Sequence, residues 1–154
     1  MAAGPFIVPY LAKLNLVNAT DLLAANTSNF RLALVTSSYT PNLSTDELWS
    51  SVSAFEIAGG TGYTTGGAPL TGVTLTQSGG VVTFTSAAYV WTASGGGIAA
   101  WRRSVLYYLG TLNSKLNPLV AYFLGDGTNI DVPTTTAGNT LTYTPSGSGI
   151  LTLT

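Results

Sequence analysis

The chain has 154 residues, of which five are basic and six acidic, and it contains no histidine and no cysteine. Histidine is the usual general base near neutral pH, and cysteine supplies thiolate nucleophiles and soft metal ligands. The composition therefore argues against an enzyme and predicts no cofactor. The net charge of −1 argues against nucleic acid as a partner, because that binding depends on clustered cations.

The first stretch of the chain, residues 1–9, is predicted to be an extended arm. Pro5 and Pro9 disfavour a regular helix, and the apolar side chains between them need a site that excludes water. No basic residue precedes this apolar stretch, so a signal peptide is not predicted. We expect the arm to reach a neighbouring subunit. The residues expected to make this contact are Phe6, Ile7, Val8 and Tyr10.

Three short elements are predicted after the arm. Residues 10–24 show the spacing of one short amphipathic helix, which closes an N-terminal segment of arm and helix. Residues 30–36 alternate between two sets of side chains and predict a strand. Ser44 and Glu47 form the pattern of a capping box, so a second short helix is predicted over about residues 45–53.

The remainder of the chain shows the period-two alternation of strands, separated by glycine-rich turns. Residues 58–67 read as a flexible, turn-rich segment, and residues 72–77 and 81–85 are expected to form a hairpin. Many short strands between such turns predict an all-β fold, an antiparallel β-sandwich or jelly roll. We assign residues 1–29 to the arm and helix and residues 30–154 to one β-sandwich domain. The further predicted strands are residues 89–91, 98–109, 119–124, 141–144 and 150–154.

Arg102 and Arg103 lie next to each other in the longest of these strands, so their side chains are expected on opposite faces. The face that carries Arg103 is the more apolar and is predicted to be the core face. Arg103 should then be buried in the assembled protein, against a carboxylate, carbonyl groups or an aromatic ring. Arg102 should be exposed and available to the acidic surface of a partner.

Other candidate sites have a simpler structural interpretation. Residues 126–131 superficially resemble a calcium loop, but they depart from the ligand pattern and are predicted to be a turn. The glycine-rich residues 59–67 and 95–97 lack the lysine of a phosphate-binding loop. A sugar-stacking platform built from tryptophans is an alternative to the more common role of core packing. The tryptophans concerned are Trp49, Trp91 and Trp101.

Four segments carry strand-and-turn signatures: residues 30–41 (FRLALVTSSYTP), 60–64 (GTGYT), 90–98 (VWTASGGGI) and 138–152 (GNTLTYTPSGSGILT). In order and spacing they resemble a family of small structural proteins of tailed bacteriophages. The resemblance implies a virion component assembled in the cytoplasm of the host bacterium. It favours a capsid decoration, or cement, protein on the outside of the head shell over a tail or head–tail connector subunit. A host-surface glycan-binding module is the remaining alternative.

The predicted partners follow from this resemblance and from the low charge. Sparse charge leaves strand edges such as residues 81–85 unprotected, and burial between subunits would cover them. We expect a homo-oligomer, with a trimer favoured over a dimer, bound to the major capsid protein or other virion proteins. No apolar run reaches the length needed to cross a bilayer, so no membrane partner is predicted.

Overall fold

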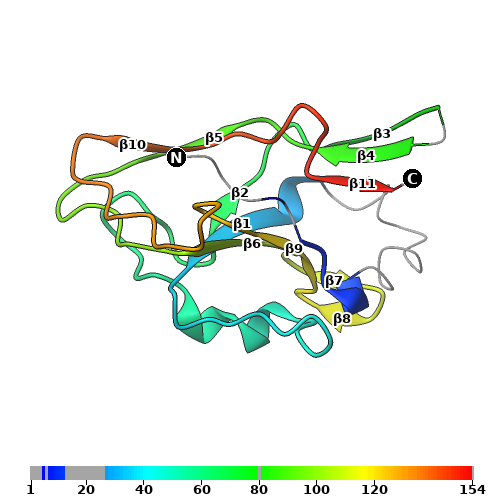
Figure 1. Ribbon diagram of the computed structural model, residues 1–154, viewed down its shortest axis with the longest axis horizontal. Coiled ribbons are helices and arrows are strands. Elements are labelled where there is room, and N and C mark those ends of the chain that lie inside the picture. The colour runs from blue at the N-terminus through cyan, green and yellow to red at the C-terminus, as the bar shows by residue number, and fades with distance from the viewer. Residues whose placement is uncertain (1–4, 6, 13–26, 80, 154) are drawn as a thin grey trace.

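Two facing layers of antiparallel strands form the framework of the protein, and loops with short helical turns cover one outer face (Figure 1). This computed structural model describes residues 5, 7–12, 27–79 and 81–153. All strand pairs within these residues are antiparallel, and their helical segments are short turns. The predicted all-β, sandwich-like fold is therefore confirmed.

The central layer is a four-stranded sheet. Its strands are β1 (Phe30–Val35), β2 (Ala68–Pro69), β6 (Arg103–Tyr108) and β9 (Leu119–Leu124). They lie in the order β2-β1-β6-β9, with Phe30 opposite Tyr108 in the register of β1 and β6. The predictions for residues 30–36 and 119–124 are confirmed by β1 and β9.

The facing layer consists of two smaller sheets, one that pairs β10 with β5 and one in the order β11-β4-β3. The strands are β3 (Thr74–Ser78), β4 (Val81–Thr85), β5 (Tyr89–Thr92), β10 (Thr140–Tyr143) and β11 (Leu151–Leu153). The predicted hairpin is present, since Ser78 pairs with Val81 across a two-residue connection. Gly79 in that connection has a φ of 58°, a conformation in which glycine is the least strained residue.

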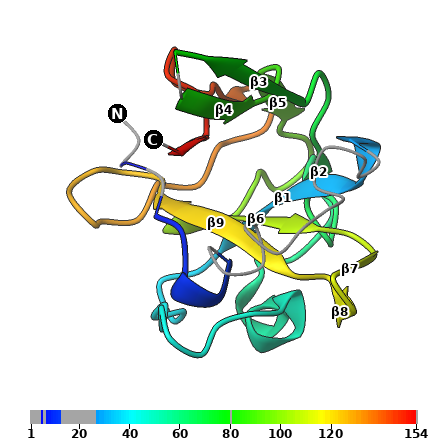
Figure 2. The same cartoon turned by 90° about the vertical axis from the view of Figure 1, so that its right-hand side faces the viewer.

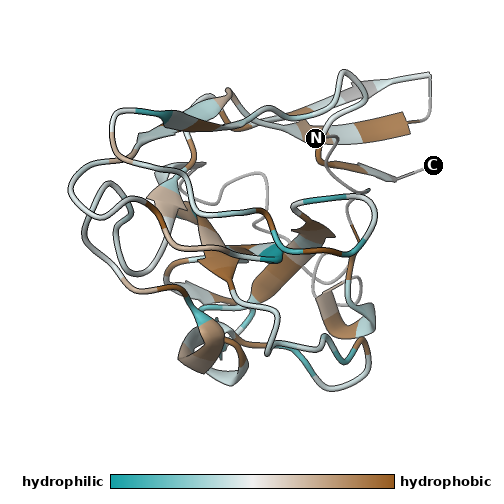
Figure 3. Cartoon of the chain, turned by 60° about the vertical axis from the view of Figure 1, so that its left-hand side comes forward, coloured by the Kyte–Doolittle hydropathy of each residue, from teal (hydrophilic) through white to brown (hydrophobic). Residues whose placement is uncertain are grey.

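Side chains on both faces of the central sheet are buried, and hydrophobic residues dominate its strands (Figure 3). Between the two layers lies a core that includes Phe30, Leu32 and Leu34, which we call the inter-sheet core. On the opposite face lies a smaller core that includes Ala33 and Val35, which we call the outer core. Burial on both faces explains why these strands are almost continuously apolar.

The segment that covers the outer core contains two 3-10 turns in place of the single short helix predicted over about residues 45–53. The turns are η2 (Trp49–Ser51) and η3 (Ser53–Phe55). The predicted capping box is also wrong, because η2 begins after Leu48 without a side-chain cap. The Glu47 carboxylate instead accepts a hydrogen bond from the Lys115 ammonium group at 3.2 Å. A third turn, η1 (Thr27–Asn29), directly precedes β1.

The strand predicted over residues 98–109 is shorter in the structure and corresponds only to β6. Upstream of β6, Ile98 and Trp101 form isolated bridges with Thr135 and Val132. A bend at Arg102 follows these bridges and separates the two ends of the predicted strand into different pairings. One long strand was predicted because the period-two alternation of side chains continues upstream of β6, where the pairing partners are different.

Both faces of β6 are buried, whereas a single core face was predicted. On the side of Arg103, Val105 and Tyr107 belong to the outer core. On the other side, Leu106 and Tyr108 belong to the larger inter-sheet core. Loops cover the outer core and so bury the Arg103 side of β6 as well. The alternation of side chains within one strand gives no indication of such loops.

Two further segments complete the comparison. Residues 10–12 are helical, and the rest of the helix predicted over residues 10–24 lies outside the described residues. A hairpin that the sequence did not predict follows β6, formed by β7 (Thr111–Leu112) and β8 (Lys115–Leu116). Its turn residues Asn113 and Ser114 have φ values of 50° and 61°, which match the left-handed positions of a tight hairpin turn.

Candidate functional site

The described residues of the arm lie against their own chain, along the edge of β9 (Figure 2). The Ile7 amide donates to the Tyr122 carbonyl at 2.7 Å, and the Tyr122 amide donates to the Ile7 carbonyl at 2.9 Å. Val8 packs against the inter-sheet core, and Pro9 is fully buried. Within the chain the arm pairs with the edge strand β9, and its contact with a neighbouring subunit stays a prediction. Phe6 lies outside the described residues.

Three of the predicted contact residues meet around Tyr122. The backbone of Ile7 is hydrogen-bonded to the backbone of Tyr122, while Tyr10 and Arg103 affect the pKa of the Tyr122 phenol electrostatically. Burial raises the pKa of Tyr122, the positive charge of Arg103 opposes that rise, and Asp46 and Tyr10 add to it. Ile7, Tyr10, Arg103 and Tyr122 therefore form one patch, the arm–arginine surface.

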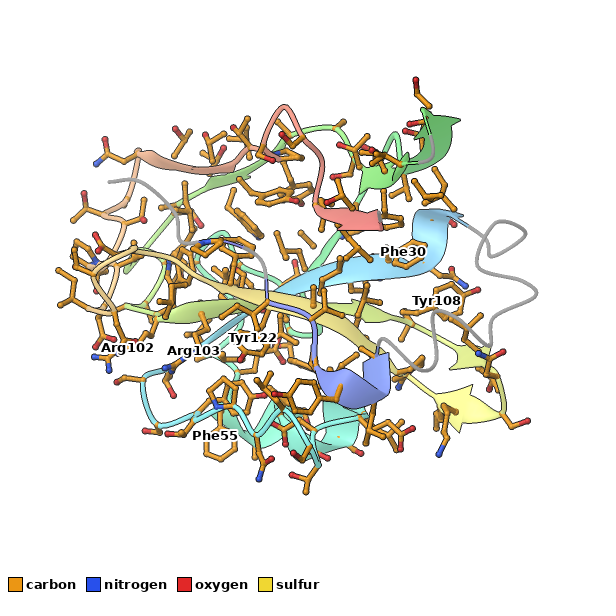
Figure 4. The ribbon with its side chains drawn as sticks, turned by 45° about the vertical axis from the view of Figure 1, so that its right-hand side comes forward. Phe30, Phe55, Arg102, Arg103, Tyr108 and Tyr122 are labelled. Atoms are coloured by element: carbon orange, nitrogen blue, oxygen red, sulfur yellow. The ribbon has the colours of Figure 1, made fainter. Side chains whose placement is uncertain are left out.

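Arg103 is held by oxygen atoms of the loops around it (Figure 4). One terminal nitrogen donates to the Tyr39 carbonyl at 2.6 Å, and the other donates to the Asn129 side-chain oxygen at 3.3 Å. The prediction that carbonyl oxygens could satisfy this cation is confirmed. Burial, and then the neighbouring Arg102 charge, lower the pKa of Arg103. The guanidinium group is half-buried within the single chain.

Arg102 has a partner within the chain that the sequence did not reveal. Its Nε donates to the Asp131 carboxylate at 2.8 Å, with side-chain exposures of 26% and 41%. Arg102 is thus partly buried in an ion pair within the chain, where an exposed side chain was predicted, and its contact with a partner stays a prediction. Asp131 appeared in the sequence only as part of a possible calcium loop, and nothing local to it indicates a distant arginine.

The interpretations of the acidic loops as turns are borne out by their hydrogen bonds. The Asp126 carboxylate accepts hydrogen bonds from the Thr128 amide and hydroxyl, and these bonds lower the pKa of Asp126. In the glycine-rich loop, the Glu56 carboxylate accepts hydrogen bonds from the Gly66 amide and the Tyr63 hydroxyl. The loop is thus turn-rich, as predicted, and its Gly66 amide is hydrogen-bonded to the Glu56 carboxylate. Within the described part of the chain, no cluster of three potential metal ligands occurs.

The three tryptophans belong to the cores and form no surface platform. Trp49 is 9% exposed, Trp91 is 4% exposed and Trp101 is 6% exposed. Trp49 stacks on Tyr107 in the outer core, with ring centroids 4.6 Å apart. The prediction of core packing is confirmed for these side chains, so a sugar-stacking surface would require other residues.

No helix among the described residues is long and apolar enough to cross a membrane. Comparison with protein families, curated proteins and solved structures finds no match to this chain. The described surface does carry large apolar side chains that are more than one-third exposed. They are Ile7, Tyr10, Val90, Leu109, Leu116 and Ile130.

Proposed function

We propose that this chain is a structural protein of a tailed-phage virion that decorates and stabilises the outer surface of the head shell. The four segments that resemble phage structural proteins supply much of the sandwich. Residues 30–41 contain β1, residues 90–98 contain most of β5, and residues 138–152 contain β10 and the start of β11. Residues 60–64 belong to the loop held by Glu56. The resemblance thus rests on strand and turn segments and not on catalytic motifs.

The observation that carries the proposal is an uncharged sheet with an open edge. β3, β4 and β11 contain no charged residue and no proline. In the described sheet β3 is hydrogen-bonded to β4 alone, so its other edge has unpaired backbone groups. Proteins normally protect such edges with charges or prolines, because an unprotected edge pairs with another chain. An assembled state would bury this edge.

The proposed mechanism is binding energy distributed over many copies. Exposed apolar side chains such as Val90, Leu116 and Ile130 add contact area outside the open edge. A subunit that joins neighbouring capsomers stabilises the shell by the area that it buries across their junction. Repetition around a symmetric particle then multiplies a modest contact into a stable assembly. A trimer on a three-fold axis suits this mechanism best.

Head shells that lack this chain provide the test. Purified protein is added to them, and occupancy and position are measured by sedimentation and electron cryomicroscopy. We expect density on the outer face of the shell and a homo-oligomer of the free protein. Thr76→Lys adds a charge to the open edge of β3 and should weaken attachment about tenfold or more. Thr136→Lys, in an exposed loop, is the matched control and should bind as the unmodified protein does.

Two results would count against the proposal. A monodisperse monomer at micromolar concentration would contradict the oligomer, and unchanged attachment of Thr76→Lys would remove the role of the open edge. Density in the tail or at the connector would favour those alternatives and overturn the assignment to the head shell.

A further inference from the structure

The open edge of β3 presents a defined set of backbone groups. β4 lies between β3 and β11, and the Phe84 carbonyl on β4 accepts a hydrogen bond from the Ile150 amide, directly before β11, at 2.8 Å (Figure 1). The backbone groups of Phe84 therefore point away from β3, so Leu75, which lies opposite Phe84, is not hydrogen-bonded to it. The Leu75 amide and carbonyl then point to the open edge, and by alternation those of Gln77 do as well.

The sequence of β3 suits pairing with a copy of itself. In an antiparallel pair about a two-fold axis at Thr76, this residue lies opposite Thr76 of the second copy, and Thr74 lies opposite Ser78. The outward-pointing groups then match: the Leu75 amide donates to the Gln77 carbonyl of the second copy, and the Gln77 amide donates to the Leu75 carbonyl. A charge at the axis would face itself and repel, and β3 carries no charge.

A row of threonines crosses the sheet and ends at this edge. Thr76 lies opposite Thr83 on β4, and Thr83 lies opposite Thr152 on β11. Thr76 and Thr152 are exposed, and Thr83 is half-buried. Threonine pairs across antiparallel strands stabilise a sheet. A two-fold axis at Thr76 would continue this row from one copy into the next, whereas a register shifted by one residue would interrupt it.

The two edges of this sheet differ in length. β11 has three residues and β3 has five, and very short edge strands are poor templates for pairing. A contact that uses β3 of both copies also closes on itself, because a two-fold contact occupies the same surface in each subunit. Pairing of β3 with β3 therefore gives a defined pair of subunits and not an open fibre.

We propose that the open edge of β3 pairs, antiparallel and about a two-fold axis at Thr76, with β3 of a second copy of this chain. This inference rests on the proposed function, in which assembly covers the edge, and it names the partner and the register. On a symmetric shell, such two-fold contacts link oligomers that lie on three-fold axes.

Cysteine cross-linking tests the register, because the chain has no cysteine of its own. In purified Thr76→Cys the two Cβ atoms would lie about 4.5–5.5 Å apart, so mild oxidation should give a disulfide-linked dimer. Thr74→Cys is the matched control on the same strand and face, but its own copy would lie about 14 Å away. It should cross-link about tenfold more slowly or less. A mixture of Thr74→Cys and Ser78→Cys should form the mixed dimer.

Hydrogen exchange provides a second readout that needs no substitution. The Leu75 and Gln77 amides should be protected at high protein concentration and should exchange rapidly after dilution. The Thr76 amide, which points to β4, should be protected at both concentrations. Thr76→Lys places two like charges at the axis and should abolish the concentration-dependent protection, while circular dichroism establishes that the variant is folded.

The pairing is overturned if Thr76→Cys and Thr74→Cys cross-link equally fast, or if the Leu75 amide is unprotected at every concentration. Protection of Leu75 only on head shells would also overturn it, because an extended segment of another virion protein would then be the occupant. The pairing and the virion role can fail separately. Register-specific cross-linking without density on head shells supports the pairing and contradicts the virion role, and density without cross-linking does the reverse.

Discussion

The two faces of the central sheet are packed in different ways. On the outer face, Trp49 stacks on Tyr107 at an interplanar angle of 3°, and the Tyr107 hydroxyl donates to the Gly66 carbonyl at 2.7 Å. On the inter-sheet face lies a cavity of about 700 Å³, and the Trp101 donor has no partner among the described residues. The same strands therefore contribute to one core with a closely stacked aromatic pair and to another core that borders a cavity.

The difference follows from what covers each face. The outer core is covered by a loop whose backbone is bonded directly to the sheet region: the Trp49 amide donates to Asn117, and the Leu119 amide donates to the Glu47 carbonyl. A loop fixed in this way can follow the surface of the sheet. The inter-sheet core is covered by two separate small sheets, whose own hydrogen bonds limit how closely their side chains approach. The cavity lies on this side of the central sheet.

Alanine substitutions at two glycines test this contrast between the two cores, and they have the largest expected effect on stability. Gly67 has a φ of 78°, and an added Cβ would lie 2.6 Å from the Leu32 carbonyl oxygen, so Gly67→Ala strains rigid backbone. We expect a loss of about 3 kcal/mol in the free energy of unfolding. Gly125→Ala meets the Trp101 ring, which borders the cavity and can shift into it, so we expect a loss of about 1 kcal/mol.

Urea unfolding measures both effects. Gly147→Ala is the control, since nothing lies within 4 Å of a Cβ at that position and its effect should be near zero. Equal losses for Gly67→Ala and Gly125→Ala would mean that the indole has no space to move, which contradicts an open cavity beside it.

A titration to alkaline pH compares how one tyrosine from each core contributes to stability. Burial is the main cause that raises the pKa of Tyr107 and of Tyr143 from 10.0 to about 12. Because the folded state favours the neutral phenol, each tyrosine contributes to the free energy of unfolding. This contribution is complete below pH 10 and is lost as the pH rises through about 12. Each shift corresponds to roughly 2–3 kcal/mol.

Circular dichroism across this pH range should show alkaline unfolding, and absorbance should report ionisation of the phenols. Tyr107→Phe and Tyr143→Phe should each reduce the alkaline loss of stability. If Tyr143 ionised near pH 10 while Tyr107 did not, the cavity beside Tyr143 would be open to water and the contrast between the cores would be larger than proposed.

Local sequence signals predicted the strands well where turns and alternation agree. The hairpin of β3 and β4 and the strand β9 are such cases, because their limits are set by nearby glycines and by continuous apolar character. The single short helix predicted over residues 45–53 does not form, because the Asp46 side chain makes other hydrogen bonds. Its carboxylate accepts hydrogen bonds from the Tyr39 hydroxyl and the Asn42 amide, which fixes a turn instead of a helix start.

The candidate sites were harder to predict, because they depend on contacts between distant segments. Arg102 and Asp131 are 29 residues apart, and Ile7 pairs with Tyr122 on β9. Residue type and spacing carry no information about such pairs. The same holds for the Trp101 Nε1–H, whose lack of a partner among the described residues depends on the three-dimensional packing around it.

A buried hydroxyl with two partners provides a smaller test within the inter-sheet core. The Tyr63 hydroxyl donates to Glu56 at 2.6 Å and accepts from the Leu34 amide at 3.0 Å. Tyr63→Phe leaves both groups without this partner, and we expect a loss of about 2 kcal/mol. Tyr108→Phe is the control, because its hydroxyl accepts only a long bond of 3.4 Å from Asn29 among the bonds described, and its loss should be below about 1 kcal/mol. Equal losses would show that the Tyr63 hydroxyl does not hold the glycine-rich loop.

The two adjacent arginines give the smallest expected effects and distinguish the outer core from the surface ion pair. Arg103→Met removes a part-buried hydrogen bond to the Tyr39 carbonyl and an exposed one to the Asn129 side chain, and we expect a loss of about 1 kcal/mol that persists in high salt. Arg102→Met breaks a partly exposed ion pair with Asp131, which should cost less than about 0.5 kcal/mol and vanish in high salt. Thermal unfolding at low and high ionic strength measures both. Because Arg103 belongs to the arm–arginine surface and Arg102 is neutralised within the chain, Arg103→Met should also weaken attachment to head shells more than Arg102→Met does. The reverse order would mean that the ion pair opens on binding and that Arg102 is the residue that meets the partner.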